Sequence, residues 1–138
     1  MNIELIKIDN PSAEDTKPIT DGISSYGLAE VGGIEPINKA IHLKLDTQII
    51  GGATGKIHFG KFYLDQIWVS EKHRNQGYGT KIHALALEIA KENGCKSICL
   101  QTLNEKAVKL YLKRGYKTVA QVEDYVKGFN LYHMLMPL

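Results

Sequence analysis

Apolar and polar positions in the first part of this 138-residue chain follow two periods, and these periods predict its elements. Residues 3–8 alternate with a period of two, which predicts an opening strand. A helical spacing follows, with Ile19, Ile23 and Tyr26 on one face. Asp15 or Thr16 would cap that helix, and Gly32-Gly33 would end it.

Residues 41–45 and 48–56 flank Asp46-Thr47, and this arrangement predicts a hairpin. Gly51-Gly52 lies inside the second of these segments, which indicates a bulge or a close approach of two backbones. A strong strand, residues 62–69, comes next.

The second half of the chain alternates between helical and strand patterns. Residues 80–93 predict the clearest helix, whose apolar side is formed by Ile82, Leu85, Ala86, Ile89 and Ala90. Residues 97–102 predict a strand parallel to 62–69, and a short helix follows at 106–114. Residues 117–125 and 131–136 predict two last strands. We expect one α/β domain across residues 1–138.

The segment from Arg74 to Thr80 is the most informative stretch of the chain. It reads Arg-Asn-Gln-Gly-Tyr-Gly-Thr and connects the strand 62–69 to the helix 80–93. A strand, a glycine-containing loop and a helix amino terminus together favour an anion, because loop amides and the helix dipole converge on one point. The segment therefore predicts a phosphate-binding loop. The alternative is that Gly77 and Gly79 only make a tight turn.

Two other glycine motifs do not fit. A dinucleotide loop requires a third glycine where this chain has Ile82. A nucleoside triphosphate loop requires a different glycine spacing from that of residues 51–56, and a hydroxyl where Ile57 stands.

A second motif lies at residues 104–116. Asn104, Ala107 and Tyr111 are three and four positions apart, so a helix that starts near Asn104 places all three on one face. Gly115 follows where a helix ends in a left-handed residue.

Together, Arg-x-x-Gly-x-Gly and the Asn–Ala–Tyr–Gly-Tyr pattern resemble the GCN5-related N-acetyltransferase (GNAT) superfamily. The resemblance implies a mixed, mostly antiparallel sheet of six to seven strands with a splayed parallel central pair and helices on both faces. It implies an enzyme that transfers an acetyl group from acetyl-CoA to a primary amine by direct attack in a ternary complex.

The resemblance also implies the cofactor site. The pantetheine arm would pair with the backbone of Ile67, Trp68 and Val69, and Asn104 would bind the arm or cap its helix. The diphosphate would be held by residues of the loop, namely Arg74, Gln76, Gly77, Tyr78, Gly79 and Thr80.

Two catalytic residues are expected. Tyr111 would protonate the departing thiolate, unless it is a core residue of an amphipathic helix. Asp65 would be the general base, unless it is a simple charge at a strand edge. Alternation places Tyr63, Asp65, Ile67 and Val69 on one face of their strand.

Composition narrows the partners. A net charge of +2 argues against nucleic acid, and no apolar run is long enough for a membrane span. Cys95 and Cys99 do not supply a metal site, and no metal is expected. We expect a cytoplasmic enzyme for a small amine, and the resemblance allows a homodimer. The alternatives are an enzyme for protein lysines or amino termini and a regulatory module that binds acyl-CoA without turnover.

Overall fold

The computed structural model describes residues 1–30 and 35–138. They form two compact units, Met1–Glu35 and Pro36–Leu138, and each unit is described by itself. The expected helix stop at Gly32-Gly33 lies outside the described residues. One domain across residues 1–138 stays a prediction.

The first unit contains one helix, α1 (Ala13–Glu30). Its cap is Ser12 rather than the expected Asp15 or Thr16. Ser12 Oγ accepts a hydrogen bond from the Asp15 amide (3.2 Å), and Asp15 Oδ2 accepts one from the Ser12 amide (2.8 Å). This reciprocal pair is a capping box, and the carboxylate of Asp15 completes the box from inside the helix.

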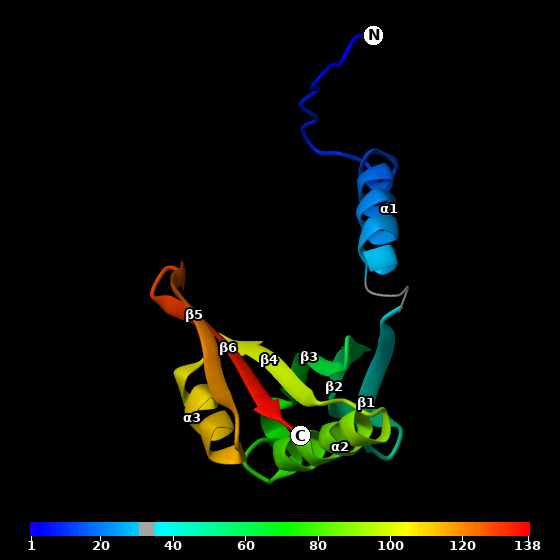
Figure 1. Cartoon of the computed structure of the whole chain (residues 1–138). Coiled ribbons are helices and arrows are strands. Elements are labelled where there is room, and N and C mark those ends of the chain that lie inside the picture. The colour runs from blue at the N-terminus through cyan, green and yellow to red at the C-terminus, as the bar shows by residue number, and fades with distance from the viewer. Residues whose placement is uncertain (31–34) are drawn as a thin grey trace. The chain divides into compact units, whose positions relative to one another are not determined.

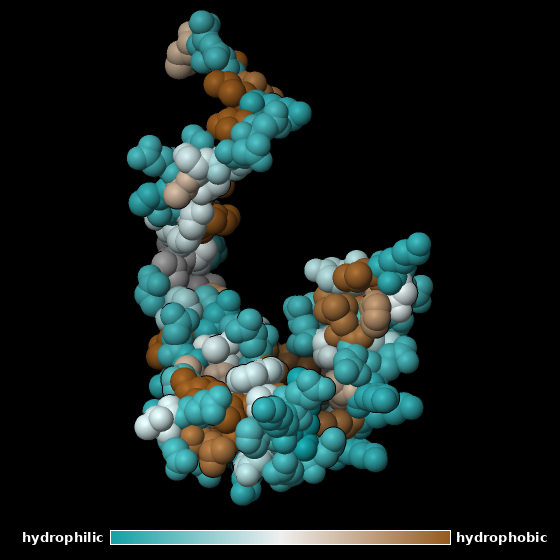
Figure 2. Space-filling view, turned by 180° about the vertical axis from the view of Figure 1, so that it is seen from behind, coloured by the Kyte–Doolittle hydropathy of each residue, from teal (hydrophilic) through white to brown (hydrophobic). Residues whose placement is uncertain are grey.

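The expected opening strand at residues 3–8 is wrong. These residues have no strand assignment, and none of the described strand pairs includes them. Ile3, Leu5 and Ile6 are exposed, and apolar side chains are visible on the surface of this unit (Figure 2). Alternation shows that a segment suits a strand, but a strand forms only where a neighbour completes its ladder.

The second unit is a six-stranded sheet with two helices and a 3₁₀ turn, η1 (Glu71–His73) (Figure 1). The strand order is β1-β2-β3-β4-β6-β5, in which β3 and β4 are parallel and all other neighbours are antiparallel. The bounds are β1 (Ile37–Leu45), β2 (Gln48–His58), β3 (Lys61–Val69), α2 (Tyr78–Glu92), β4 (Ser97–Thr102), α3 (Glu105–Arg114), β5 (Lys117–Val126) and β6 (Phe129–Pro137).

The sheet confirms the mixed α/β fold class. The predicted hairpin at Asp46-Thr47 joins β1 to β2, and Asp46 has the positive φ that such a turn requires. Backbones also approach closely at the predicted glycines, because a Cβ on Gly52 would lie 2.0 Å from the carbonyl oxygen of Ile41.

The core lies between one face of the sheet and the two helices. Helix α2 buries Ile82, Ala86 and Ala90 there, and α3 adds Val108 and Tyr111 at the edge. Leu85 was expected on this face but is exposed, and Leu87 packs against the core instead. The sheet residues of the core include Phe62, Leu64, Ile98, Leu100 and Met134.

Candidate active site

The two parallel strands separate before they end. Pairing between β3 and β4 runs from Lys61 with Ser97 to Leu64 with Leu100, although β3 continues to Val69 and β4 to Thr102. Beyond this point, among the described residues, the backbone of Ile67, Trp68 and Val69 pairs only with β2 on its other side. The side of β3 that faces the gap can therefore pair with an added extended chain.

A β-bulge at Asp65 accompanies this separation. Thr54 of β2 pairs with Gln66 and Gly55 pairs with Leu64, so Asp65 is the extra residue. The bulge reverses the alternation, and Ile67 and Val69 pack against the core on the same face as Phe62 and Leu64. The expectation that Tyr63, Asp65, Ile67 and Val69 share one face is therefore wrong.

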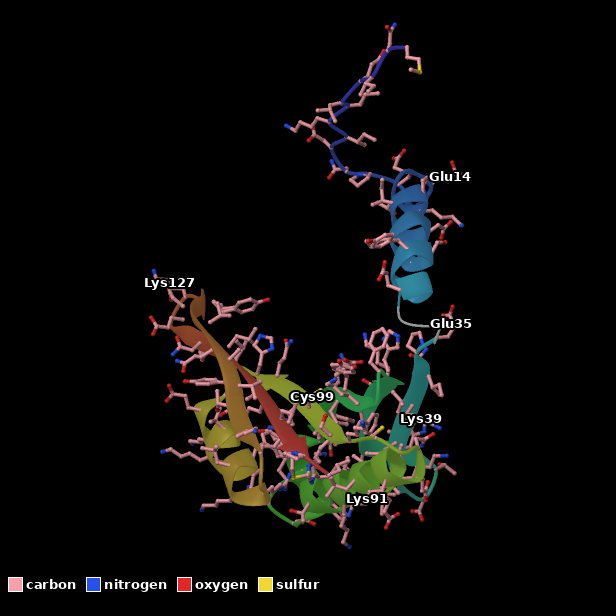
Figure 3. The ribbon with its side chains drawn as sticks, viewed as in Figure 1. Glu14, Glu35, Lys39, Lys91, Cys99 and Lys127 are labelled. Carbon is pink, nitrogen blue, oxygen red and sulfur yellow. The ribbon has the colours of Figure 1, made fainter. Side chains whose placement is uncertain are left out.

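A cavity of about 350 Å³ lies on the sheet face opposite α2. Its polar lining comes from alternate positions of three strands, namely Lys61, Tyr63, Asp65, Cys99, Gln101 and His133. Figure 3 labels Cys99 on β4. Burial raises the pKa of the Cys99 thiol, which keeps it protonated at neutral pH.

A second cavity, of about 230 Å³, fills the gap between β3 and β4. Asp65 and Gln101 line both cavities, so the two adjoin at the bulge. The second cavity is lined by Leu64, Asp65, Gln66, Ile67, Leu100, Gln101, Thr102, Asn104, Ala107 and Tyr111. The predicted helix face of Asn104, Ala107 and Tyr111 is therefore turned toward the gap.

The sequence predicted residues on one side of this candidate site and none on the other. Gln101, Cys99 and His133 were not predicted, because single polar residues within apolar strands carry no motif. Their signal was only the alternation, which places Cys99 and Gln101 on the face that Ile98 and Leu100 do not use.

The predicted anion loop has the geometry of a cradle. Gly77 has φ +84° and precedes the first turn of α2, and this left-handed conformation favours glycine. The first intrahelical bond runs from the Lys81 amide to the Gly77 carbonyl (3.2 Å). The amides before Lys81 have no carbonyl partner inside the helix and face its amino end.

The fold does not require glycine at position 79. A Cβ there would meet no heavy atom within 4 Å, and Gly79 lies inside a helix. The fold therefore leaves room for a Cβ at this position. The absence of a side chain keeps the loop amides accessible to something from outside the chain.

The rest of the loop is braced by its own hydrogen bonds. Arg74 Nε donates to the carbonyl of Val69 (2.9 Å), and Gln76 Nε2 donates to the carbonyl of Lys72 (3.3 Å). Ser70 Oγ lies 2.6 Å from His73 Nδ1. Arg74 and Gln76 therefore hold the loop against the end of β3.

Asn104 caps α3, one of its two expected roles. Its Oδ1 accepts hydrogen bonds from the amides of Lys106 (2.9 Å) and Ala107 (3.3 Å). Asn104 also lines the gap between β3 and β4. Gly115 ends the helix with φ +106°, as the sequence predicted.

Tyr111 lies at the centre of an aromatic cluster. Its ring packs edge-on against Tyr116 with the centroids 5.2 Å apart, and Tyr116 Oη shares a 2.7 Å hydrogen bond with His83 Nε2. Burial raises the pKa of Tyr111, and the Arg114 guanidinium partly opposes this shift. Burial first, and then Arg114, lowers the pKa of His83 to about 4, so this imidazole is neutral at pH 7.

Comparison with known proteins identifies the family. Residues 4–116 match the profile of the Acetyltransferase (GNAT) family. The chain is 30% identical over 124 residues to the acetyltransferase Atu2258 of Agrobacterium fabrum, which covers 89% of this chain and 90% of that protein. It is 27% identical over 92 residues to the blasticidin-S acetyltransferase of Streptomyces morookaense, covering 66% and 68%.

Solved structures agree. An acetyltransferase from Bacillus cereus superposes with a TM-score of 0.85 at 27% identity, covering 96% of this chain and 98% of that one. A Bacillus anthracis protein crystallised with acetyl coenzyme A superposes with a TM-score of 0.66 at 27% identity, covering 75% and 64%. This chain belongs to the GNAT family, and it is an acetyl-CoA-dependent N-acetyltransferase.

Proposed function

We propose that this acetyltransferase moves the acetyl group of acetyl-CoA to the primary amine of a small molecule, by direct attack in a ternary complex. The observation that carries the proposal is the open space at Gly79, in the first turn of α2. The amides at this helix end are accessible there, and the parallel strands β3 and β4 separate nearby.

The cofactor would lie along this path. Amides of Gly77, Tyr78, Gly79 and Thr80 would bind the diphosphate, because unpaired N–H groups at a helix amino end favour anions. Arg74 and Gln76 would brace this cradle through their bonds to the backbone. The pantetheine arm would pair with Ile67, Trp68 and Val69 and pass the amino group of Asn104.

The chemistry is one exchange of bonds. The amine nitrogen attacks the thioester carbon, a C–N bond forms and the C–S bond breaks. The departing thiolate takes a proton from the hydroxyl of Tyr111. Tyr111 suits this role because it lines the gap, and because its raised pKa keeps the phenol protonated until the thiolate forms.

Asp65 would receive the proton that the substrate ammonium must lose. Removing a proton from an aliphatic ammonium of pKa about 10.4 costs about 4–5 kcal/mol at pH 7, which favours a base. Asp65 lines both cavities at the bulge and is therefore within reach of an amine in either cavity.

The acceptor would occupy the cavity that contains Tyr63, Cys99 and His133. Its volume of about 350 Å³ suits a small molecule rather than a long peptide. The relative from Streptomyces morookaense is named for a small molecule, blasticidin S.

No helix among the described residues has the length and apolarity to cross a bilayer. With a net charge of +2, we propose a cytoplasmic protein without nucleic-acid or membrane partners.

The test is thiol release from acetyl-CoA across a panel of polyamines, amino sugars, amino acids, aminated antibiotics and lysine peptides. We expect release with one class of small amine and background rates with the peptides. If only the peptides gave release, the acceptor would be a protein and not a small amine. Binding of acetyl-CoA without release by any acceptor would contradict the catalytic proposal.

A further inference from the structure

Arg114 joins the two halves of the proposed site. It is the last residue of α3, and its Nη2 donates a hydrogen bond to Thr80 Oγ1 in the first turn of α2 (3.0 Å). The same guanidinium lies 5.7 Å from the centroid of the Tyr111 ring. One side chain therefore contacts both a residue of the diphosphate cradle and the proposed proton donor.

The charge of Arg114 has no anionic partner among residues 1–30 and 35–138. The two salt bridges found there, Lys7–Asp9 and Lys17–Asp21, both lie in the first unit. The carboxyl end of α3 favours a cation at this position, but the amino end of α2 repels one. An anion bound beside Thr80 would satisfy both the guanidinium and the helix end.

The guanidinium also has unused donors. It carries five N–H groups in a planar fork, and the bond to Thr80 uses one of them. Such a fork matches phosphate oxygens in pairs, which a lysine ammonium does not reproduce.

Arg114 is not needed to hold α2 against the end of α3. The buried bond between His83 Nε2 and Tyr116 Oη already ties these segments together at 2.7 Å, and the edge-on packing of Tyr111 against Tyr116 supports it. The bond from Arg114 to Thr80 is exposed, and an exposed bond of this kind adds little to stability.

We propose that Arg114 is a further cofactor-binding residue, whose guanidinium binds the diphosphate of acetyl-CoA together with Thr80. This inference rests on the proposed function, because it assumes the diphosphate at the amino end of α2.

The test compares two ligands on the full chain by calorimetry: acetyl-CoA, and S-acetylpantetheine, which has the same thioester arm without the diphosphate. Arg114→Gln should raise the Kd for acetyl-CoA about tenfold, as expected for one charge-assisted hydrogen bond. The Kd for S-acetylpantetheine should not change. Lys113→Gln removes the neighbouring exposed charge of the same helix and should change neither Kd. Arg114→Lys should fall between wild type and Arg114→Gln.

Two results would overturn the inference. If Arg114→Gln raised the Kd values for both ligands equally, Arg114 would have a structural role. If the Kd for acetyl-CoA did not change, Arg114 would not belong to the cofactor site. If Arg114→Gln does not fold, the test rests on Arg114→Lys alone. The lysine lacks the planar fork, so Arg114→Lys should raise the Kd for acetyl-CoA and leave the Kd for S-acetylpantetheine unchanged. The wild type reports on the proposed function separately. If it bound both ligands equally, the diphosphate cradle itself would be wrong.

Discussion

At the scale of single residues, environment decides which titratable groups act in chemistry and which support the fold. Tyr111 and Tyr116 are close in sequence, and both are buried enough to raise their pKa values. Only Tyr111 lines the gap between β3 and β4, whereas the hydroxyl of Tyr116 is engaged by His83. The same residue type therefore has a proposed catalytic role at one position and a structural role at the other.

Tyr111→Phe tests the proton donor. We expect kcat to fall by about 10²–10⁴-fold, the range for a general acid, with the Kd for acetyl-CoA unchanged. Because burial raises the Tyr111 pKa above that of a free tyrosine, the alkaline fall in wild-type kcat should lie at higher pH than for an exposed tyrosine, and it should be absent in the variant. Thiol-release rates between pH 6 and about 11 measure kcat and its alkaline fall. Tyr125→Phe, in an exposed part of β5, is the control. Wild-type kcat in Tyr111→Phe would exclude the role.

His83 predicts how stability depends on pH. The folded chain lowers its pKa from 6.5 to about 4, so the unfolded chain binds more protons between these values. Stability from His83 is complete above pH 6.5 and is lost as pH falls toward 4, by about 3 kcal/mol at most. Urea unfolding across this range measures the slope. His83→Gln should flatten it, and the exposed His42→Gln should leave it unchanged. An equal slope in wild type and His83→Gln would contradict the prediction.

At the scale of elements, the candidate site lies where regular strand pairing stops. Strands β3 and β4 separate after Leu64 and Leu100, β3 bulges at Asp65, and α2 begins after the left-handed Gly77. Each interruption leaves backbone groups or a side chain available to a ligand. The regular parts of the sheet hold these interruptions in place.

Gly79→Val tests the cradle at the start of α2. A Cβ at this position meets no heavy atom within 4 Å, so the melting temperature should stay close to that of wild type. It would cover the helix-end amides, and we expect the Kd for acetyl-CoA to rise about tenfold or more. Calorimetry and thermal unfolding measure the two quantities. Gly22→Val in α1, another helical glycine with open space around it, is the control. Unchanged affinity in Gly79→Val would place the diphosphate elsewhere.

At the scale of the whole molecule, the described residues of the first unit include several large apolar side chains that are exposed. Ile3, Leu5, Ile19, Ile23 and Tyr26 all have more than half of their surface accessible. Large apolar side chains that gather into an exposed patch are usually covered in the functional protein. We propose that a second copy of the chain covers these side chains, in the homodimer that the family resemblance allows.

The homodimer has a direct test. Light scattering over a range of concentrations should give about twice the 15.4 kDa mass of one chain. Leu5→Asp places a charge on the exposed apolar surface and should shift the mass toward one chain, whereas Lys7→Asp, on the same segment, should not. A single-chain mass for the wild type at every concentration would refute the dimer.

The sequence by itself determined the features that depend on neighbours along the chain. The hairpin at Asp46-Thr47, the cap at Asn104, the left-handed Gly115 and the loop before α2 were all predicted, because turn and cap chemistry acts over a few residues. The family motifs belong to the same class, since each is a local arrangement of backbone and helix end.

Only the tertiary structure decided features that need a partner far away in the chain. The bulge at Asp65 depends on pairing with β2, and it reversed the predicted face of Ile67 and Val69. The bond between His83 and Tyr116 joins residues 33 positions apart. Residues 3–8 have the alternation of a strand and formed none, since the ladder needs a second strand that alternation cannot supply.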